Sequence, residues 1–357
     1  QAEAKDDATP EFDAAILVEG RTNVWDMAFL PGPEQRLLFT ERQGSLNVWS
    51  NGQVRQVVSF ADVVARGEGG LMGVAVDPQF ESNRSVYACL NSSAGDTDDI
   101  RVIRLRLDAD NLQPGNRQDI VTGITANPSG RHSGCRLAFG PDGYLWIGTG
   151  DAALGAEPQQ PDSLNGKILR VGRDGRAAPG NLGQAGFDAR IYSYGHRNTQ
   201  GLAFFPKVKN GVIGLSAEHG SNIDDELNPL SKGNFGWAPA AGYGEQGVPM
   251  TDRQRFPDAV QAVWSSGEAT QAPSGIAIIN SSAWRGWDGA AVVAILKDKH
   301  LKVLRLDNQN KVTREERALE AEYGRLRAVV QGPDDSLYVS TDNNSNDKII
   351  RLTPRKN

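Results

Sequence analysis

Six times along the chain, a short apolar run is followed by a turn rich in Pro, Gly and Asp, and then by a second apolar run that ends in polar residues. Each run is about four to seven residues long and rich in β-branched and aromatic side chains, which is typical of strands and not of helices. We interpret every copy as a β-hairpin. The copies span residues 25–41, 71–90, 135–151, 201–220, 274–297 and 326–343.

A third strand-like segment follows five of these hairpins, at residues 45–50, 100–108, 166–172, 301–307 and 348–354. Repeats of about 60 residues, each a small antiparallel sheet, are typical of a β-propeller. The pattern therefore predicts an all-β chain that forms a six-bladed β-propeller of four-stranded antiparallel blades. A β-sandwich is the alternative, but its strands would not repeat one hairpin six times.

The last copy has three strands, so a fourth must come from elsewhere in the chain. We expect the segment AILVEG, residues 15–20, to pair with the last strand and close the ring. Residues 1–14 are then a flexible N-terminal segment, and residues 15–357 form a single propeller domain. The first ten residues lack both a Met start and an apolar stretch, which is typical of a processed or a trimmed chain. The location that we expect is periplasmic or secreted.

Composition excludes several classes of protein. A hydrophobic fraction of 39% with seven Trp is enough for a packed core. Lys and Arg total 38 against 44 Asp and Glu, with no basic block, which argues against nucleic acid as a partner. The longest aliphatic run, residues 290–296, is far shorter than the ~20 residues of a membrane helix, so no membrane span is expected.

Two cysteines, Cys89 and Cys135, are too few for a disulfide scaffold or a thiolate zinc site. Each lies in a strand-like segment of a neighbouring repeat. One disulfide and two buried free thiols both remain open.

Polar residues gather in the loops that enter the first strand of each blade and in those that follow its second strand. Antiparallel alternation places both kinds of loop on one face of a propeller. We expect all six blades to contribute to one central mouth there, as a binding site or as an ion-paired plug of the channel. The residues are Arg21, Thr22, Asn23, Glu41, Arg42, Glu68, Arg131, His132, Asp151, Arg197, Asn198, Gln200, Glu218, His219, Thr270, Lys297, Arg325, Arg327 and Asp342.

At these residues the sequence resembles the soluble dehydrogenases of glucose, aldoses and sorbosone that depend on pyrroloquinoline quinone (PQQ). The resemblance runs over about residues 16–353, in the order of that family. Its motifs are GEGGLMGVAVDPQF, RHSGCRLAFGPDGYLWIGTGD, LNGKILRVGRDG, IYSYGHRNTQGLAF, EHGSNIDDELN and GNFGWAPAAGYG.

The resemblance implies catalytic roles for three residues. His132 would be the general base that takes the proton of the anomeric hydroxyl while hydride passes to the quinone, a role suited to an imidazole. Asp151 would orient His132 or contact the substrate. Arg197 would stabilise negative charge on the quinone oxygens.

The resemblance also implies cofactor and metal ligands. Arginine and lysine side chains suit the three carboxylates of PQQ. Calcium beside PQQ would be bound by the backbone carbonyls of Gly220 and Ser221, and a second calcium by Ala241, Tyr243 and Glu245. The implied PQQ ligands are Arg197, Asn198, Gln200, Lys297, Arg325, Arg327, Thr270 and Glu68.

Two positions depart from the family pattern. Glu68 stands where relatives carry Gln, which adds a negative charge beside a trianionic ligand. Arg131 stands where some relatives carry Asp next to the catalytic His. The loop before the fifth hairpin keeps Thr270 but lacks the aromatic residues of some relatives, so glucose specificity does not follow from the resemblance.

The expected activity is that of a calcium-dependent PQQ dehydrogenase, which oxidises the anomeric carbon of aldoses to lactones. Its electrons would pass to a quinone, a cytochrome or an artificial dye. Two alternatives stay open. A calcium-dependent sugar lactonase would use a carboxylate-ligated metal and need no cage of cations, and a non-catalytic propeller would bind carbohydrate or protein.

Overall fold

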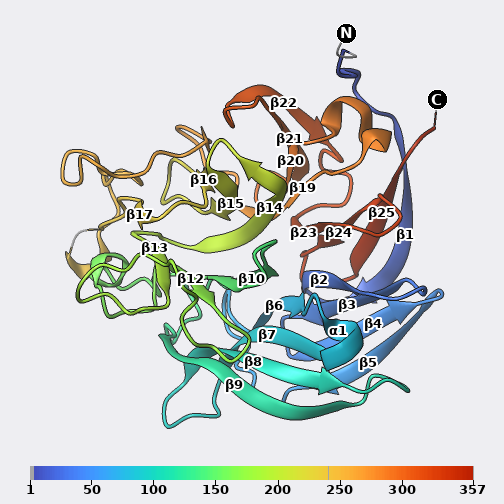
Figure 1. Ribbon diagram of the computed structural model, residues 1–357, viewed down its shortest axis with the longest axis horizontal. Coiled ribbons are helices and arrows are strands. Elements are labelled where there is room, and N and C mark those ends of the chain that lie inside the picture. Colours follow the sequence, from blue (N-terminus) through green and yellow to red (C-terminus); the bar gives the residue numbers. More distant parts are fainter. Residues whose placement is uncertain (1–3, 240, 357) are drawn as a thin grey trace.

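The computed structural model describes residues 4–239 and 241–356 and is built almost entirely of β-strands arranged as six sheets in a ring (Figure 1). Each sheet has four antiparallel strands, and one of them carries a short fifth strand. The predicted six-bladed β-propeller is confirmed. In the described part of the chain, no helix is long and apolar enough to cross a membrane.

The blades follow one another along the chain, and the strands of each blade run outward from the axis. Blade one comprises β2 (Val24–Leu30), β3 (Arg36–Glu41), β4 (Ser45–Ser50) and β5 (Gln53–Ser59). Blade two comprises β6 (Leu71–Val76), β7 (Ser85–Ser92), β8 (Asp99–Leu107) and β9 (Pro114–Thr125), with helix α1 (Phe80–Asn83) between β6 and β7. Blade three comprises β10 (Arg136–Phe139), β11 (Leu145–Gly148), β12 (Lys167–Val171) and β13 (Ile191–Tyr194), with the 3-10 turn η1 (Glu157–Gln159).

The remaining blades repeat this order. Blade four comprises β14 (Thr199–Lys209), β15 (Val212–Glu218), β16 (Glu226–Pro229) and β18 (Trp264–Ser265). Blade five comprises β19 (Pro273–Ile278), β20 (Ala291–Ile295), β21 (His300–Leu306) and β22 (Val312–Ala318), with the 3-10 turn η3 (Ser282–Trp287). Blade six comprises β23 (Leu326–Gln331), β24 (Leu337–Thr341), β25 (Asp347–Pro354) and β1 (Phe12–Arg21).

The N-terminal strand closes the ring, as the sequence predicts. β1 pairs antiparallel with β25, from Phe12 opposite Pro354 to Arg21 opposite Asp347. The blue and red strands therefore lie side by side in Figure 1. The strand begins at Phe12, three residues before the predicted domain start, and the Ala8 carbonyl accepts a hydrogen bond of 2.8 Å from the Gly286 amide of blade five.

The apolar core of the described residues is divided among six clusters; five are packed between two neighbouring blades, and the one between blades two and three also includes Trp25 of blade one. Trp146 and Leu202, for example, join blades three and four, and Leu38 and Leu90 join blades one and two. The innermost strands β2, β6, β10, β14, β19 and β23 also contact one another in turn around the axis. Because each blade packs mainly on its two neighbours, the loops at its ends stay free for other roles.

Blade four departs from the repeat between its third and fourth strands. Residues 230–263 form a long insertion that includes β17 (Gly233–Asn234) and the 3-10 turn η2 (Ala241–Tyr243). β17 pairs in parallel with β13, the last strand of blade three. The insertion is therefore attached to the neighbouring blade.

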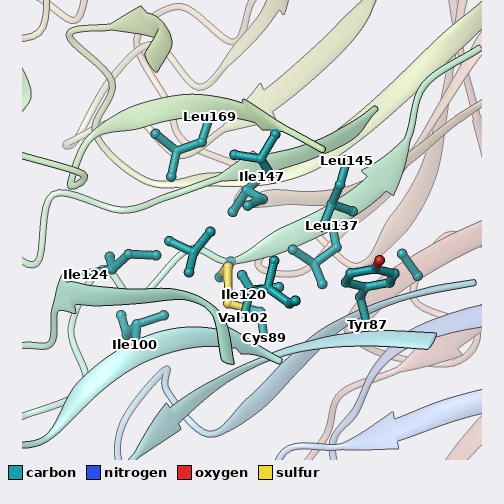
Figure 2. Packing of buried hydrophobic residues seen from close by; sticks show 14 of the residues in the cluster. Tyr87, Cys89, Ile100, Val102, Ile120, Ile124, Leu137, Leu145, Ile147 and Leu169 are labelled. Carbon is teal, nitrogen blue, oxygen red and sulfur yellow. A yellow bond between two sulfur atoms is a disulfide. The ribbon is translucent and has the colours of Figure 1, made fainter. Parts of the chain in front are cut away.

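Cys89 of β7 and Cys135, just before β10, form a disulfide that joins blades two and three. Both sulfurs are buried in the cluster shown in Figure 2, beside Val102, Ile120 and Leu137. The structure thus decides between the two alternatives left by the sequence.

A pair of buried glutamates lies at one end of blade four. Glu218 ends β15 and Glu226 begins β16. The side-chain amide of Asn228 donates to the carboxylate of Glu218 at 2.8 Å and to that of Glu226 at 3.3 Å. Glu218 also bonds the His196 ring at 2.8 Å and accepts the backbone N–H of Arg197 at 2.8 Å. Burial, with the nearby charge of Glu218, raises the pKa of Glu226 to about 8, so Glu226 is largely protonated at neutral pH.

We expect the variant C89A/C135A to lose about 2–4 kcal/mol of unfolding free energy, because a disulfide between two blades restricts the unfolded chain. Urea denaturation of the variant and of the oxidised wild type measures the difference. C89A alone should lose a similar amount, since it also removes the cross-link. Equal stability of oxidised and reduced wild-type protein would contradict this role.

We expect E226Q to gain stability relative to the wild type as pH rises from about 4.5 to about 8. The pKa of Glu226 rises from the ordinary value of 4.5 in the unfolded chain to about 8 in the folded protein, so in this window the folded protein holds a proton that the unfolded chain releases. Stability of the wild type then falls by at most about 1.4 kcal/mol per pH unit. Unfolding free energies of E226Q, of the wild type and of E81Q, an exposed control, would show the effect; parallel curves would refute it.

Candidate active site

A cavity of about 360 Å³ opens on the face where the first strands of the blades begin. It brings together ten of the predicted site residues: Glu68, His132, Arg197, Asn198, Gln200, Gly220, Thr270, Lys297, Arg325 and Arg327. The cavity is also lined by His219, Asp225, Ala272 and Leu296. Among the side chains that the structure describes, the predicted residues Asp151, Ser221, Tyr243 and Glu245 are not part of its wall.

Blades two to six line this cavity, and the expectation that all six blades would do so is wrong. In blade one, Arg21 and Glu41 form an ion pair with each other at 2.5 Å. Asn23 donates to Asp342 and accepts from Gln43 at 2.6 Å. These polar side chains satisfy one another instead of reaching the cavity.

His132 precedes β10 and is held from both its backbone and its ring. The His132 amide donates to Glu68 Oε2 at 2.8 Å, and ring atom Nδ1 lies 2.7 Å from Asp151 Oδ1. The backbone has a positive φ of 52°, a conformation that non-Gly residues adopt mainly under tertiary constraint. Gly150 makes room for it, because a Cβ there would lie 1.9 Å from the His132 carbonyl oxygen. With Nδ1 facing Asp151, Nε2 is the ring nitrogen available to a ligand.

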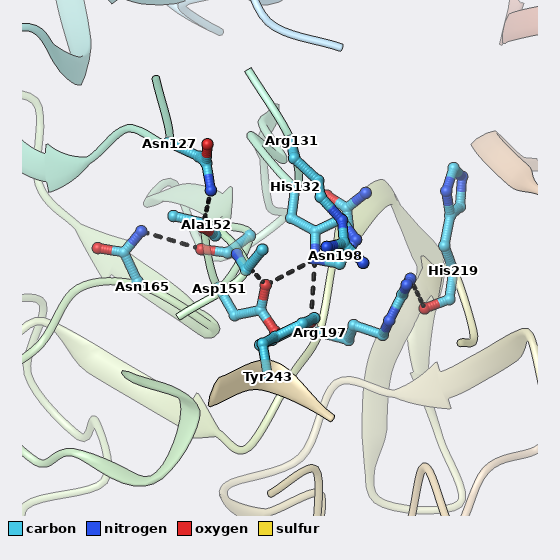
Figure 3. A network of polar contacts seen from close by, with 12 residues as sticks. Asn127, Arg131, His132, Asp151, Ala152, Asn165, Arg197, Asn198, His219 and Tyr243 are labelled. Atoms are coloured by element: carbon cyan, nitrogen blue, oxygen red, sulfur yellow. Dashed lines mark hydrogen bonds and ion pairs between the residues drawn. The ribbon is translucent and has the colours of Figure 1, made fainter. Parts of the chain in front are cut away.

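Asp151 is fully buried behind His132, in a network shown in Figure 3. Its Oδ2 accepts from Trp237 Nε1 at 2.9 Å and from the Tyr243 hydroxyl at 2.5 Å. The Tyr243 hydroxyl also lies 3.0 Å from His132 Nδ1. Burial, and then the Asp151 charge, raise the pKa of Tyr243, so its hydroxyl stays protonated and donates.

Arg197 and Asn198 come from the turn that enters β14. The Arg197 guanidinium donates to Glu245 at 2.8 Å and to the His219 carbonyl at 3.2 Å, and lies over the Trp237 ring. The Asn198 side chain donates to Glu68 at 3.0 Å and accepts from the Gly134 amide at 3.0 Å. Together with its bond to the His132 amide, Glu68 therefore connects loops of blades two, three and four.

The four cations of the cavity differ in their partners. Arg197 is paired with Glu245, and Arg327 forms two bonds to Asp342 Oδ2 at 2.6 and 2.8 Å. Lys297 donates only to the Thr270 hydroxyl, at 3.0 Å, and within the described residues neither Lys297 nor Arg325 forms an ion pair with a carboxylate. Two positive charges in one cavity thus remain for an anionic ligand.

The structure gives the side chains of the second predicted calcium site other partners. Glu245 is paired with Arg197 and, at 3.5 Å, with Arg131, and the Tyr243 hydroxyl is bonded to Asp151. Ala241 begins the turn η2. Across residues 4–239 and 241–356, no group of three or more His, Cys, Asp or Glu side chains could hold a metal ion.

Several site residues have roles that the sequence did not predict. Trp237 and the Tyr243 hydroxyl support Asp151 from the insertion of residues 230–263, and nothing in their motif, GNFGWAPAAGYG, indicates this contact. Asp225 accepts the amides of Gly220 at 2.8 Å and Ala272 at 3.0 Å. The acidic run 224–226 indicated that carboxylates lie near this loop, but its sequence did not show that Asp225 is the one that lines the cavity.

Comparison with known proteins identifies the family of this chain. The family model for glucose / sorbosone dehydrogenases matches residues 21–351. The aldose sugar dehydrogenase YliI of Escherichia coli is 31% identical, over 95% of this chain and 92% of that protein. The quinoprotein glucose dehydrogenase B of Acinetobacter calcoaceticus is 31% identical over 60% of this chain and 50% of that protein.

A solved structure is similar over nearly the whole chain. The PQQ-bound aldose sugar dehydrogenase of Streptomyces coelicolor superposes with a TM-score of 0.77 and is 30% identical, covering 97% of this chain and 100% of that one. The chain belongs to the glucose / sorbosone dehydrogenase family.

Proposed function

We propose that the protein is a PQQ-dependent aldose sugar dehydrogenase that oxidises the anomeric carbon of aldoses to lactones. One observation carries the proposal: an imidazole bonded to a buried carboxylate faces a cavity that also holds Lys297 and Arg325, two cations without carboxylate partners among the described residues. The first element can remove a proton, and the second can bind an anion. The names of the relatives supply the substrate class.

The cavity fits PQQ in its charge and in its donors. Lys297 and Arg325 would bind carboxylates of the cofactor, and Arg327 would add a third positive charge although Asp342 partly neutralises it. Thr270, Asn198 and Gln200 line the same wall and supply hydroxyl and amide groups. When bound, PQQ supplies the electrophilic quinone that accepts the two electrons and the hydrogen released from the anomeric carbon.

The proton of the anomeric hydroxyl would go to Nε2 of His132. Asp151 and the Tyr243 hydroxyl both lie beside Nδ1, which keeps the ring proton on that side and the lone pair of Nε2 toward the cavity. As the ring gains a second proton, the buried Asp151 carboxylate stabilises the imidazolium. Trp237 keeps the carboxylate in place.

Arg197 would stabilise the negative charge that develops on the cofactor side of the cavity. Its guanidinium is buried and held by Glu245 and the His219 carbonyl, so little reorganisation is needed when charge develops. Glu68 opposes a trianionic ligand electrostatically, but its two oxygens already accept from Asn198 and the His132 amide. We assign Glu68 to orienting these two groups.

Calcium would be bound by backbone carbonyls at residues 220–221. Gly220 lines the cavity, and within the described residues no protein donor bonds to the carbonyl oxygens of Gly220 or Ser221. Carbonyl oxygens are hard ligands that suit calcium. The lactonase alternative, which needs a metal held by carboxylates, has no such cluster among the described residues. A periplasmic or secreted location and a quinone, cytochrome or dye as acceptor complete the proposal.

We expect the apoprotein to bind PQQ with calcium and to gain dye-reducing activity toward aldoses only after both are added. Titration with PQQ followed by its visible spectrum measures binding, and a panel of aldoses then defines the substrate. Chelation of calcium should abolish activity reversibly. A protein that binds no PQQ under these conditions would overturn the dehydrogenase and favour a non-catalytic propeller.

We expect H132A to bind PQQ as the wild type does but to reduce dye at least about 100-fold more slowly, because a general base typically contributes at least this factor. Spectral titration and steady-state kinetics separate the two quantities. H300A is a matched control, since the His300 ring lies in blade five and bonds the Asp298 carbonyl at 2.8 Å. Undiminished dye reduction by H132A would refute the assigned base.

A further inference from the structure

Arg136 lies among the inner strands of the propeller and uses every nitrogen of its guanidinium. Nε donates to the backbone carbonyl of Gln200 at 2.6 Å. Nη1 donates to the Trp25 carbonyl at 3.2 Å and to Asp26 Oδ1 at 2.7 Å. Nη2 donates to the Ser274 hydroxyl at 3.1 Å and to the Arg327 carbonyl at 3.4 Å.

These partners belong to the innermost strands of different blades. Trp25 and Asp26 lie in β2, Gln200 in β14, Ser274 in β19 and Arg327 in β23, while Arg136 itself begins β10. The sixth inner strand, β6, joins through Asp26, whose Oδ2 accepts the Val74 amide at 2.9 Å. One ion pair therefore connects all six inner strands.

Two of these partners form the floor of the cavity. Gln200 and Arg327 both line it, and Arg327 Nη1 donates to Gln200 Oε1 at 2.7 Å. The Ser274 hydroxyl accepts from Arg136 Nη2 and also from Arg327 Nη1, which lies 3.5 Å from it. Arg136 does not line this cavity; with Asp26 it lines a second hollow of about 400 Å³, whose walls include Leu137 and Val329. Arg136 therefore lines the second hollow, while its partners Gln200 and Arg327 line the first.

The charges of this cluster require a fixed arrangement. Arg136 and Arg327 are both cations and share Ser274, and both guanidinium groups lie near the Trp25 ring, at 4.1 and 5.4 Å from its centroid. Asp26 forms an ion pair with Arg136, and Asp342 forms one with Arg327. A buried guanidinium with five satisfied donors has little freedom, whereas Lys has three donors and no planar fork.

We propose that Arg136 is a positioning residue that fixes Gln200 and Arg327 for binding of the cofactor. This inference rests on the proposed PQQ dependence. Arg136 acts only through these two residues and through Ser274. A residue needed for folding alone would lower stability and leave the affinity of the folded protein unchanged, so affinity and stability separate the two roles.

The test compares PQQ affinity, by spectral titration with calcium present, with the melting temperature of each apoprotein. R136K should weaken PQQ binding roughly tenfold or more, as expected when charge-assisted hydrogen bonds that order a ligand site are lost. R305K is the matched control, because Arg305 is also buried, bonds Glu316 through Nε at 2.7 Å and lies in blade five away from the cavity. It should lower the melting temperature and leave PQQ affinity within about twofold.

S274A is a milder variant that carries the test if R136K does not fold. It removes the hydroxyl shared by Arg136 and Arg327 and should weaken PQQ binding severalfold, with the spectrum of the bound cofactor altered. Unchanged affinity in the folded R136K, or in S274A where R136K fails to fold, would overturn the positioning role.

Crystal structures of the apoproteins give a readout that needs no PQQ. In R136K the Gln200 amide and the Arg327 guanidinium should leave their wild-type positions, whereas in R305K they should not. If the wild type binds no PQQ, the proposed function fails, and these structures alone decide whether Arg136 positions the two residues. Unmoved side chains in R136K would overturn the inference.

Discussion

Closure of the ring is the constraint on which the rest of the structure depends. The site is made of loops from blades two to six, and none of these loops holds more than a few of its residues. They meet because the ring is closed, through the pairing of β1 with β25 and through the packing of β2 on β23. The pairing joins residues more than 300 positions apart, so the site cannot be complete before the two ends of the chain meet.

Within the closed ring, the buried charges are arranged in two levels. Behind the cavity, carboxylates hold the functional groups: Asp151 holds His132, Glu218 holds the backbone of Arg197, and Asp342 holds Arg327. Facing the cavity, Lys297 and Arg325 have no such partner among the described residues. Charges that are buried need compensation, so this separation distinguishes groups that the protein itself fixes from those that a ligand can neutralise.

The fold could be predicted from the sequence because it follows from patterns that are local along the chain. Hairpins repeat at regular spacing, strand alternation decides which loops share a face, and the count of strands in the last copy indicates that another segment must close the ring. The same reasoning predicted one mouth for ten polar residues that line the cavity, His219 among them, whereas Gly220 came from the family resemblance. It did not decide whether the two cysteines form a disulfide, because the distance between strands of neighbouring blades cannot be read from the sequence of either strand.

What the sequence did not show lies in contacts between side chains distant along the chain. Tyr243 and Glu245 come from an insertion with no counterpart in the other blades, so no repeat indicates where their side chains point. In the structure the Tyr243 hydroxyl bonds to Asp151 and Glu245 bonds to Arg197, and neither contact follows from the repeat pattern or from the motif. The expectation for blade one was wrong for a related reason: Arg21 and Glu41 are close enough to pair.

Arg136 was missed although its signal was present in the repeats. Three of the repeats contain the segments WDMAF, CRLAF and LRAVV at their inner strands, which places Asp26, Arg136 and Arg327 at equivalent positions near the axis. A charged residue at a strand position that otherwise faces the core must find a partner of opposite charge, and the nearest equivalent positions are those of the other blades. In a propeller, repeats should therefore be compared across the ring as well as along the chain. Asp26 pairs with Arg136, so Arg327 takes Asp342 as its partner instead. The ion pair near the axis and the floor of the cavity therefore form one cluster.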